Sequence, residues 1–145
     1  MNCQRIEPIF GGDFPIKVLP LIEGAKQSIR IIVFDWRWYP SDPGCACQKF
    51  NNSIIRARSR SVAVSVLTNC NDVLNILRKA GIMAKKPFSK RLLHSKIIII
   101  DDKHLVIGSH NYTQSAFTSN FEISAILYNC DDLSLFIQYF NSLCH

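Results

Sequence analysis

Apolar residues are spaced in two ways along this chain, and the two spacings alternate. Apolar positions three and four residues apart predict helices over residues 17–28, 48–60, 72–80 and about 131–143. Runs rich in β-branched residues predict strands over 29–35, 61–67, 92–101, 105–107 and 121–127. Residues 92–101 have the strongest strand pattern, and residues 101–103 are the expected turn of a hairpin to 105–107. Strands that alternate with helices predict an α/β fold, with a mixed sheet sandwiched between helices.

Two segments follow neither spacing. Residues 39–47 are rich in Pro, Gly, Ser and Asp, which predicts a loop. Residues 82–91 are a short strand or a loop, and they carry the cations Lys85, Lys86, Lys90 and Arg91. Within the helix over 17–28, we expect Pro20 in the first turn, where a missing N–H is tolerated.

The length of 145 residues suits a single domain, 1–145, with one core of adequate size. Seventeen basic against eleven acidic residues give a net charge of +6, which indicates an anionic partner. Nucleic acid, phospholipid and acidic protein all meet that description. No apolar run has the length of a membrane span, and residues 1–10 lack the apolar stretch of a secretory signal. We therefore expect a cytoplasmic protein without stable membrane insertion.

The chain holds six cysteines: Cys3, Cys45, Cys47, Cys70, Cys130 and Cys144. With an adequate core and no secretory signal, we expect these thiols to be reduced and buried. Cys45 and Cys47 are separated by one residue, and no second pair of ligands follows at the spacing of a zinc site. We therefore expect no metal.

Polar residues of a particular kind interrupt the strongest strand. His94 and Lys96 are two positions apart, so their side chains project from the same face of a strand. Ile98 and Ile100 continue that face. Burial of polar groups is costly without partners, so an imidazole beside an ammonium here indicates a functional site.

A second polar group follows the hairpin. Gly108 permits a close approach of backbone, and Ser109 and Asn111 supply a hydroxyl and an amide. Together with free backbone N–H groups, these residues make a cradle for an anion. A helix that begins near residue 112 or 113 adds positive potential. A lysine, an anion cradle and a histidine suit phosphoryl chemistry, because histidine attacks phosphorus or passes protons near neutral pH.

The spacing H-x-K-x(4)-D-x(6)-G-S-x-N resembles the signature of the phospholipase D superfamily, and a downstream acid residue follows at position 122. It is matched here by His94, Lys96, Asp101, Gly108, Ser109, Asn111 and Glu122. The order of predicted elements is similar to that of the small single-motif nucleases of the superfamily, which pair as homodimers. The loop over 39–47 is slightly longer than in the plainest of them.

The resemblance implies a role for each matched residue. His94 is the expected nucleophile, forming a phosphohistidine, and the same histidine of a second copy protonates the leaving oxygen. Lys96 and Asn111 hold the non-bridging phosphate oxygens, with Ser109 assisting, and Glu122 hydrogen-bonds His94. No metal or other cofactor is expected, because fixed cations and donors stabilise the charge.

The remaining residues of the pattern have supporting or peripheral roles. Asp101 is expected to be structural, and Gly108 to shape the backbone beside the site. Lys90 and Arg91 precede His94 and are candidates for nucleic-acid contact, as is His110 at the variable position of the G-S-x-N unit. Aromatic residues cluster near the end of the first strand, where one or two are candidates to stack on bases: Phe34, Trp36, Trp38 and Tyr39.

The mechanism gives its own reason for pairing. One histidine must be neutral to attack while another is protonated to donate, and the chain contains a single H-x-K unit. A two-fold axis that brings two copies of His94 together meets both needs.

The leading hypothesis is a metal-independent endonuclease. Phospholipase activity on phosphatidyl diesters is the alternative, and a non-catalytic nucleic-acid binder is a third, which the intact motif argues against.

Overall fold

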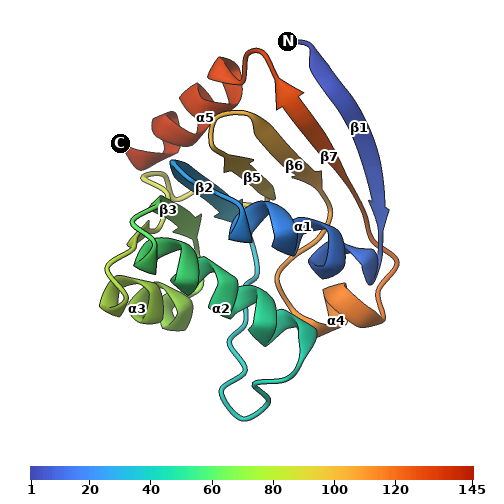
Figure 1. Ribbon diagram of the computed structural model, residues 1–145. Helices are drawn as coiled ribbons and strands as arrows, with labels where there is room; N and C mark the ends of the chain where they lie inside the picture. Colours follow the sequence, from blue (N-terminus) through green and yellow to red (C-terminus); the bar gives the residue numbers. More distant parts are fainter.

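The computed structural model describes all residues, 1–145, and contains one seven-stranded sheet with helices on both faces (Figure 1). The strand order is β1-β7-β6-β5-β2-β3-β4. The strands are β1 (Cys3–Phe10), β2 (Ser28–Val33), β3 (Ala63–Thr68), β4 (Met83–Lys85), β5 (Ile97–Ile100), β6 (His104–Gly108) and β7 (Ile123–Cys130). The helices are α1 (Asp13–Glu23), α2 (Ala46–Ser59), α3 (Asn71–Lys79), α4 (Gln114–Thr118) and α5 (Ser134–Cys144). Because β2, β3 and β4 pair in parallel and the other neighbours antiparallel, the sheet is mixed, as predicted.

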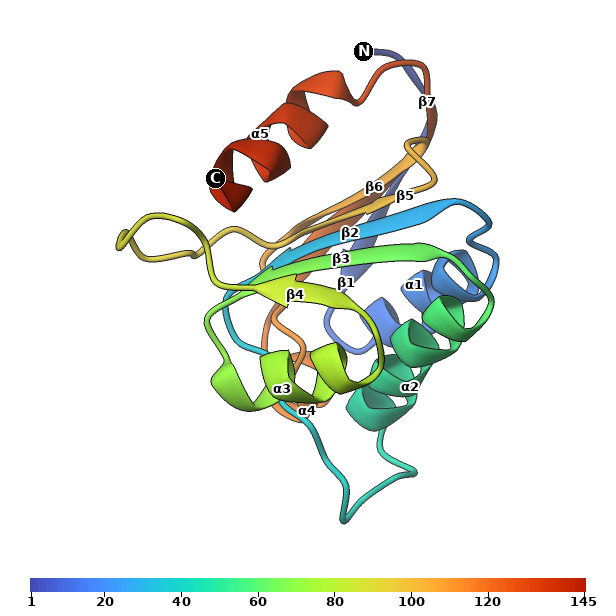
Figure 2. The ribbon, with the colours of Figure 1, turned by 90° about the vertical axis from the view of Figure 1, so that its left-hand side faces the viewer.

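The helices divide unequally between the two faces of the sheet. Seen edge-on, α1 to α4 lie against one face and α5 alone lies against the other (Figure 2). The side chains of β5 point alternately to the two faces of the sheet, so this strand contributes to a hydrophobic core on each face. Ile98 and Ile100 point into the larger core under α1 to α4, whereas Ile97 and Ile99 point into the smaller core under α5. This assignment of the two faces agrees with the sequence analysis.

Most predicted elements are present, with their ends moved. The helix predicted over 17–28 begins at Asp13 and ends at Glu23, so the prediction for Pro20 is wrong. Pro15 occupies the first turn, and Pro20 lies in the last. The strand predicted over 92–101 is paired only over Ile97–Ile100, because the pairing with both neighbours stops at Ile97. Residues 92–96 form an unpaired approach to β5.

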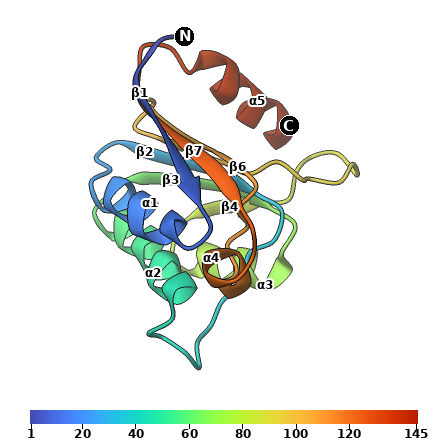
Figure 3. The same cartoon turned by 90° about the vertical axis from the view of Figure 1, so that its right-hand side faces the viewer.

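Strand β1 was not predicted from the sequence. This strand pairs antiparallel with β7 at the edge of the sheet (Figure 3). A disulfide between Cys3 and Cys130 joins the two strands. The expectation that all six thiols are reduced is therefore wrong for this pair, because the β1–β7 register places the two residues opposite each other. The other four cysteines are free.

Cys45 and Cys47 have roles in the packing of α2. The Cys45 sulfur caps the helix by accepting a hydrogen bond from the backbone N–H of Gln48. Burial raises the pKa of the Cys47 thiol to about 12, so it stays protonated near neutral pH.

No helix has both the length and the apolar character needed to cross a bilayer.

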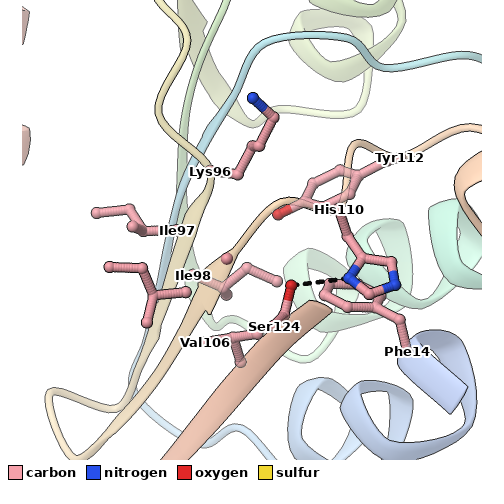
Figure 4. A pocket seen from close by; sticks show the side chains of 10 residues that line it. Phe14, Lys96, Ile97, Ile98, Val106, His110, Tyr112 and Ser124 are labelled. Atoms are coloured by element: carbon pink, nitrogen blue, oxygen red, sulfur yellow. Dashed lines mark hydrogen bonds between the residues drawn. The ribbon is translucent and has the colours of Figure 1, made fainter. Parts of the chain in front are cut away.

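His110 is a core residue, which makes its expected contact with substrate wrong. Its side chain is only 1% exposed and stacks on Phe14, with ring centroids 4.5 Å apart. Nδ1 lies 2.7 Å from the Ser124 hydroxyl (Figure 4). Nε2 lies 2.8 Å from the Gly11 carbonyl oxygen. In the neutral ring, Nε2–H donates to Gly11 and Nδ1 accepts from Ser124. His110 thus ties the start of α1 to β7.

We predict that wild-type protein, alkylated in denaturant without reduction, carries four labels per chain, and six when it is reduced in denaturant first. Reduction should lower the melting temperature, because the bond closes a very long loop in the unfolded chain. Intact mass spectrometry and calorimetry check both. Six labels before reduction would contradict the assignment.

We predict that His110→Phe keeps the stacking on Phe14 but destabilises the fold by about 1–3 kcal/mol, because two buried polar groups lose their partner. Burial lowers the pKa of His110, and the Gly11 carbonyl and the Glu122 charge offset only part of that shift. As pH falls below the ordinary value of 6.5, the unfolded chain takes up the proton first, so stability declines. His110→Phe has no titratable group at this position, so its stability lacks this dependence on pH. Denaturant unfolding between neutral and mildly acidic pH should therefore give it a shallower pH dependence; parallel curves would refute the assignment.

Candidate active site

His94 and Lys96 lie side by side in the unpaired approach to β5. Lys96 Nζ donates to the His94 carbonyl oxygen at 2.6 Å and lies 3.4 Å from His94 Nδ1. The ring of Phe34, just after β2, contacts both: its centroid is 4.9 Å from that of His94 and 5.6 Å from Lys96 Nζ. The predicted adjacency of the two side chains is confirmed, although neither residue lies in the paired strand. The supporting ring of Phe34 was named only as one of a cluster of aromatics.

The two side chains differ in their exposure to water. His94 is exposed, whereas Lys96 is half-buried. Burial lowers the pKa of the Lys96 ammonium, and the Glu122 carboxylate opposes that shift. The lysine therefore lies within electrostatic reach of an acid residue that directly precedes β7. In Figure 4 its ammonium points away from the buried His110–Ser124 pair.

A close contact between β6 and β7 forms the other side of the site. Gly108 pairs with Ser124, and a Cβ at position 108 would lie only 2.3 Å from the Ser124 Cα. Only glycine fits there without moving the backbone. The close approach of backbone expected at Gly108 is present, and its partner is β7.

This contact sets Ser109 beside Glu122. The backbone N–H of Ser109 donates to the Ile123 carbonyl at 2.9 Å, and the Ile123 N–H donates to the Ser109 hydroxyl oxygen at 3.0 Å. The Ser109 hydroxyl in turn donates to the Glu122 carboxylate. Glu122 also accepts from the Asn120 amide, at 3.2 Å. The expected hydrogen bond between Glu122 and His94 is absent, and the carboxylate is held by Ser109 and Asn120 instead.

Asn111 connects the site to the end of β2. Its side-chain oxygen accepts from the backbone N–H of Asp35 at 3.0 Å. Two backbone bonds hold the same crossing: the Tyr112 N–H donates to the Asp35 carbonyl, and the Arg37 N–H donates to the Tyr112 carbonyl. The Asn111 amide nitrogen makes no hydrogen bond to protein and stays available as a donor.

Asp101 lies at the opposite end of β5 from His94. Its carboxylate accepts the backbone N–H groups of Lys26, Gln27 and Ser28 at 2.7–3.2 Å. Burial acts against ionisation, but these donors prevail and lower the pKa of Asp101. The geometry agrees with the structural role expected from the sequence: Asp101 fastens the hairpin turn to the loop before β2.

Helix α5 forms a wall of the site that sequence reasoning did not foresee. A groove of about 570 Å³ is lined by His94, Lys96 and Gly108 on one side, and by Leu135 and Tyr139 of α5 on the other. The Tyr139 hydroxyl lies 2.8 Å from the Ser95 hydroxyl, beside the nucleophile candidate. This segment was predicted from the sequence only as a helix, and nothing in its spacing indicates which residues line the groove.

An uncovered part of the sheet borders the site. Phe10, Ile107 and Ile123 lie on the face that α5 covers only in part, since Phe10 pairs with Ile123 and Ile107 continues from the buried Leu105. These three side chains and Phe121 are exposed to water. We call this set the open apolar face. A hollow at its edge is lined by both Ser109 and Glu122.

Among the residues considered as contacts to nucleic acid, some are exposed to water and others are held by hydrogen bonds within the protein. Lys86, Lys90 and Arg91 are exposed, but Lys85 donates to the Cys144 carbonyl at 2.8 Å and is engaged at the end of α5. Trp36 is buried, with its indole N–H donating to Asn51, so it cannot stack on a base.

Comparison with known proteins fits this geometry. A family model described as "Cardiolipin synthase, PLD-like domain" matches residues 18–144. The mitochondrial cardiolipin hydrolase of dog is 32% identical over 133 residues, covering 88% of this chain and 49% of that protein. The mouse 5'-3' exonuclease PLD4 is 29% identical over 132 residues, covering 80% of this chain and 26% of that protein.

The chain thus spans about half, or less, of the length of these relatives. Among solved structures, the phospholipase D family member Nuc from Salmonella typhimurium superimposes with a TM-score of 0.80. The match covers 97% of this chain and 95% of Nuc at 22% identity, which shows a shared fold. With a family model that matches nearly the whole chain and a fold that agrees, the protein belongs to the phospholipase D superfamily.

Proposed function

We propose that the protein is a metal-independent phosphodiesterase that hydrolyses nucleic acid as an endonuclease. The carrying observation is the juxtaposition of the His94 imidazole and the Lys96 ammonium, 3.4 Å apart, in an open groove. A nucleophile beside a fixed cation is what attack on a phosphodiester requires, because the cation stabilises the charge that develops on the phosphate oxygens.

The nitrogen that attacks is Nε2 of His94, which makes no hydrogen bond to protein. Its lone pair is free when the ring proton is on Nδ1, and Lys96 then donates to the His94 carbonyl oxygen instead. The lone pair forms a bond to phosphorus, and the bond to the leaving oxygen breaks. Lys96 and the free Asn111 amide hold the non-bridging oxygens. Water then cleaves the phosphohistidine and restores the imidazole.

The leaving oxygen needs a proton that this copy of His94 cannot give. A second, protonated His94 supplies it and then takes a proton from the attacking water, so we propose an active site shared by two copies. The open apolar face supports this, since it borders Ser109 and Glu122 and leaves large apolar side chains in water. A two-fold axis at this face buries them and brings the two grooves together.

Nucleic acid is the preferred substrate because the chain carries a net charge of +6 and the site is open to a long polyanion. The relationship to an exonuclease supports the same choice. One observation favours phosphatidyl diesters as the second candidate. The groove beside His94 has an apolar wall, Leu135 and Tyr139, which suits an acyl chain, and one relative is a cardiolipin hydrolase.

We predict that the wild-type protein cuts labelled DNA or RNA in excess EDTA. His94→Ala and Lys96→Ala should each lower the rate by about a thousandfold or more, because each removes a group that acts on the reacting phosphate. His145→Ala, at the exposed C-terminus, is the matched histidine control and should cut like wild type.

Turnover of phosphatidyl substrates by a protein that leaves nucleic acid intact would replace the leading proposal with the second candidate. Cleavage that needs added metal, or that survives His94→Ala, would refute the mechanism.

We predict that the protein has a mass of about twice 16.5 kDa in solution. Ile123→Asp should yield monomers and abolish cleavage, because a carboxylate on the open apolar face cannot be buried unpaired. Ile16→Asp, on the exposed side of α1, is the control and should remain dimeric and active. Light scattering and the cleavage assay measure both; a fully active monomer would exclude the shared site.

A further inference from the structure

The loop over residues 86–92, between β4 and β5, stands away from the body of the molecule (Figure 2). It presents two large apolar side chains to water: Phe88 is 79% exposed and Leu92 is 70% exposed. Such residues normally pack in a core, and one short loop rarely exposes two of them without a partner. The 86–92 loop is separate from the open apolar face, which lies on β1, β6 and β7.

The charges of this loop are all positive. Lys86, Lys90 and Arg91 are exposed, and none of them forms an ion pair. No acidic residue occurs between Asp72 and Asp101. The loop therefore combines unneutralised cations with exposed apolar side chains, which is the combination that binds the surface of an anionic bilayer.

Two hydrogen bonds fasten this part of the chain to the C-terminal end of α5, a helix without charged side chains. The Phe88 N–H donates to the Leu143 carbonyl at 2.8 Å, and Lys85 holds the Cys144 carbonyl. Helix α5 has no charged residue along Ser134–Cys144, and it exposes Leu135, which is 76% exposed. The side chains of the loop and of α5 thus include cations and exposed apolar groups but no carboxylate.

Three partners can be compared on this chemistry. A nucleic acid would engage the cations and could stack on Phe88, but it has no use for the aliphatic side chains of Leu92 and Leu135. A second copy would bring a second set of cations against the first, which is repulsive. A bilayer with anionic headgroups accommodates both kinds of side chain, because phosphates lie directly above an apolar layer.

We propose that the 86–92 loop docks the protein on an anionic lipid bilayer. Phe88 and Leu92 enter the boundary between headgroups and acyl chains, while Lys86, Lys90 and Arg91 contact lipid phosphates. This proposal concerns membrane binding alone, so it does not depend on which phosphodiester the active site cleaves. It places His94, two residues after Leu92, next to the membrane surface.

The test is co-sedimentation of the full chain with vesicles of phosphatidylcholine alone, and with vesicles that also contain phosphatidylglycerol. Wild-type protein should bind only the anionic vesicles. Lys90→Gln with Arg91→Gln should weaken binding about fivefold per cation removed. The double variant Phe88→Ser with Leu92→Ser should weaken vesicle binding at least as much. The binding that this variant retains is electrostatic, so it should vanish in high salt.

Matched controls lie elsewhere on the surface: Lys49→Gln for charge and Ile16→Ser for exposed apolar area should both bind like wild type. Circular dichroism confirms that each variant is folded. Equal binding by the Phe88–Leu92 variant and wild type overturns the proposal, as does the absence of any preference for anionic vesicles. Loss of oligonucleotide binding in both loop variants, with no vesicle binding by wild type, assigns the loop to nucleic acid instead.

Discussion

The contact between the backbones of β6 and β7 at Gly108 determines where the polar groups of the site lie. Without a side chain at this position, the two strands approach closely enough for Ser109 to exchange hydrogen bonds with Ile123 and to meet Glu122. The same crossing directs His110 inward, onto Phe14 and Ser124, while the next residue, Asn111, reaches the end of β2. A larger residue at 108 would separate all of these groups at once, because each depends on the register of one strand pair.

The other half of the site depends on the hairpin of β5 and β6. Asp101 fixes its turn through three backbone N–H groups, and the pairing of Ile97 with Ile32 and Ile107 fixes its open end. Lys96 directly precedes Ile97 and His94 lies two residues further from it, so the end of β5 fixes the point from which the nucleophile candidate projects.

Much of the fold and part of the site could be predicted from local pattern. Segments with clear periodicity, such as β2, β3 and α3, were found because burial selects apolar residues at regular intervals. Strand β1 was missed because the alternation of Arg5, Ile6 and Glu7 is short and stops at Pro8, a residue that an edge strand tolerates. The adjacency of His94 and Lys96 follows from two-residue spacing, which is local.

Long-range partners could not be read in the same way. The partners of Glu122 and the burial of His110 depend on which strands are neighbours and in what register, and composition carries no record of that. The disulfide between Cys3 and Cys130 has the same origin, since nothing near either residue indicates the other.

The position of β1 has a consequence for synthesis on the ribosome. The first strand to leave the exit tunnel pairs with the last strand of the sheet, so its hydrogen-bonding edge has no partner until β7 has emerged. The central strands and α1 to α3 have their own partners much earlier. During synthesis β1 therefore stays unpaired, with a free Cys3 thiol, until β7 has been made, and only then can the seven-stranded sheet close.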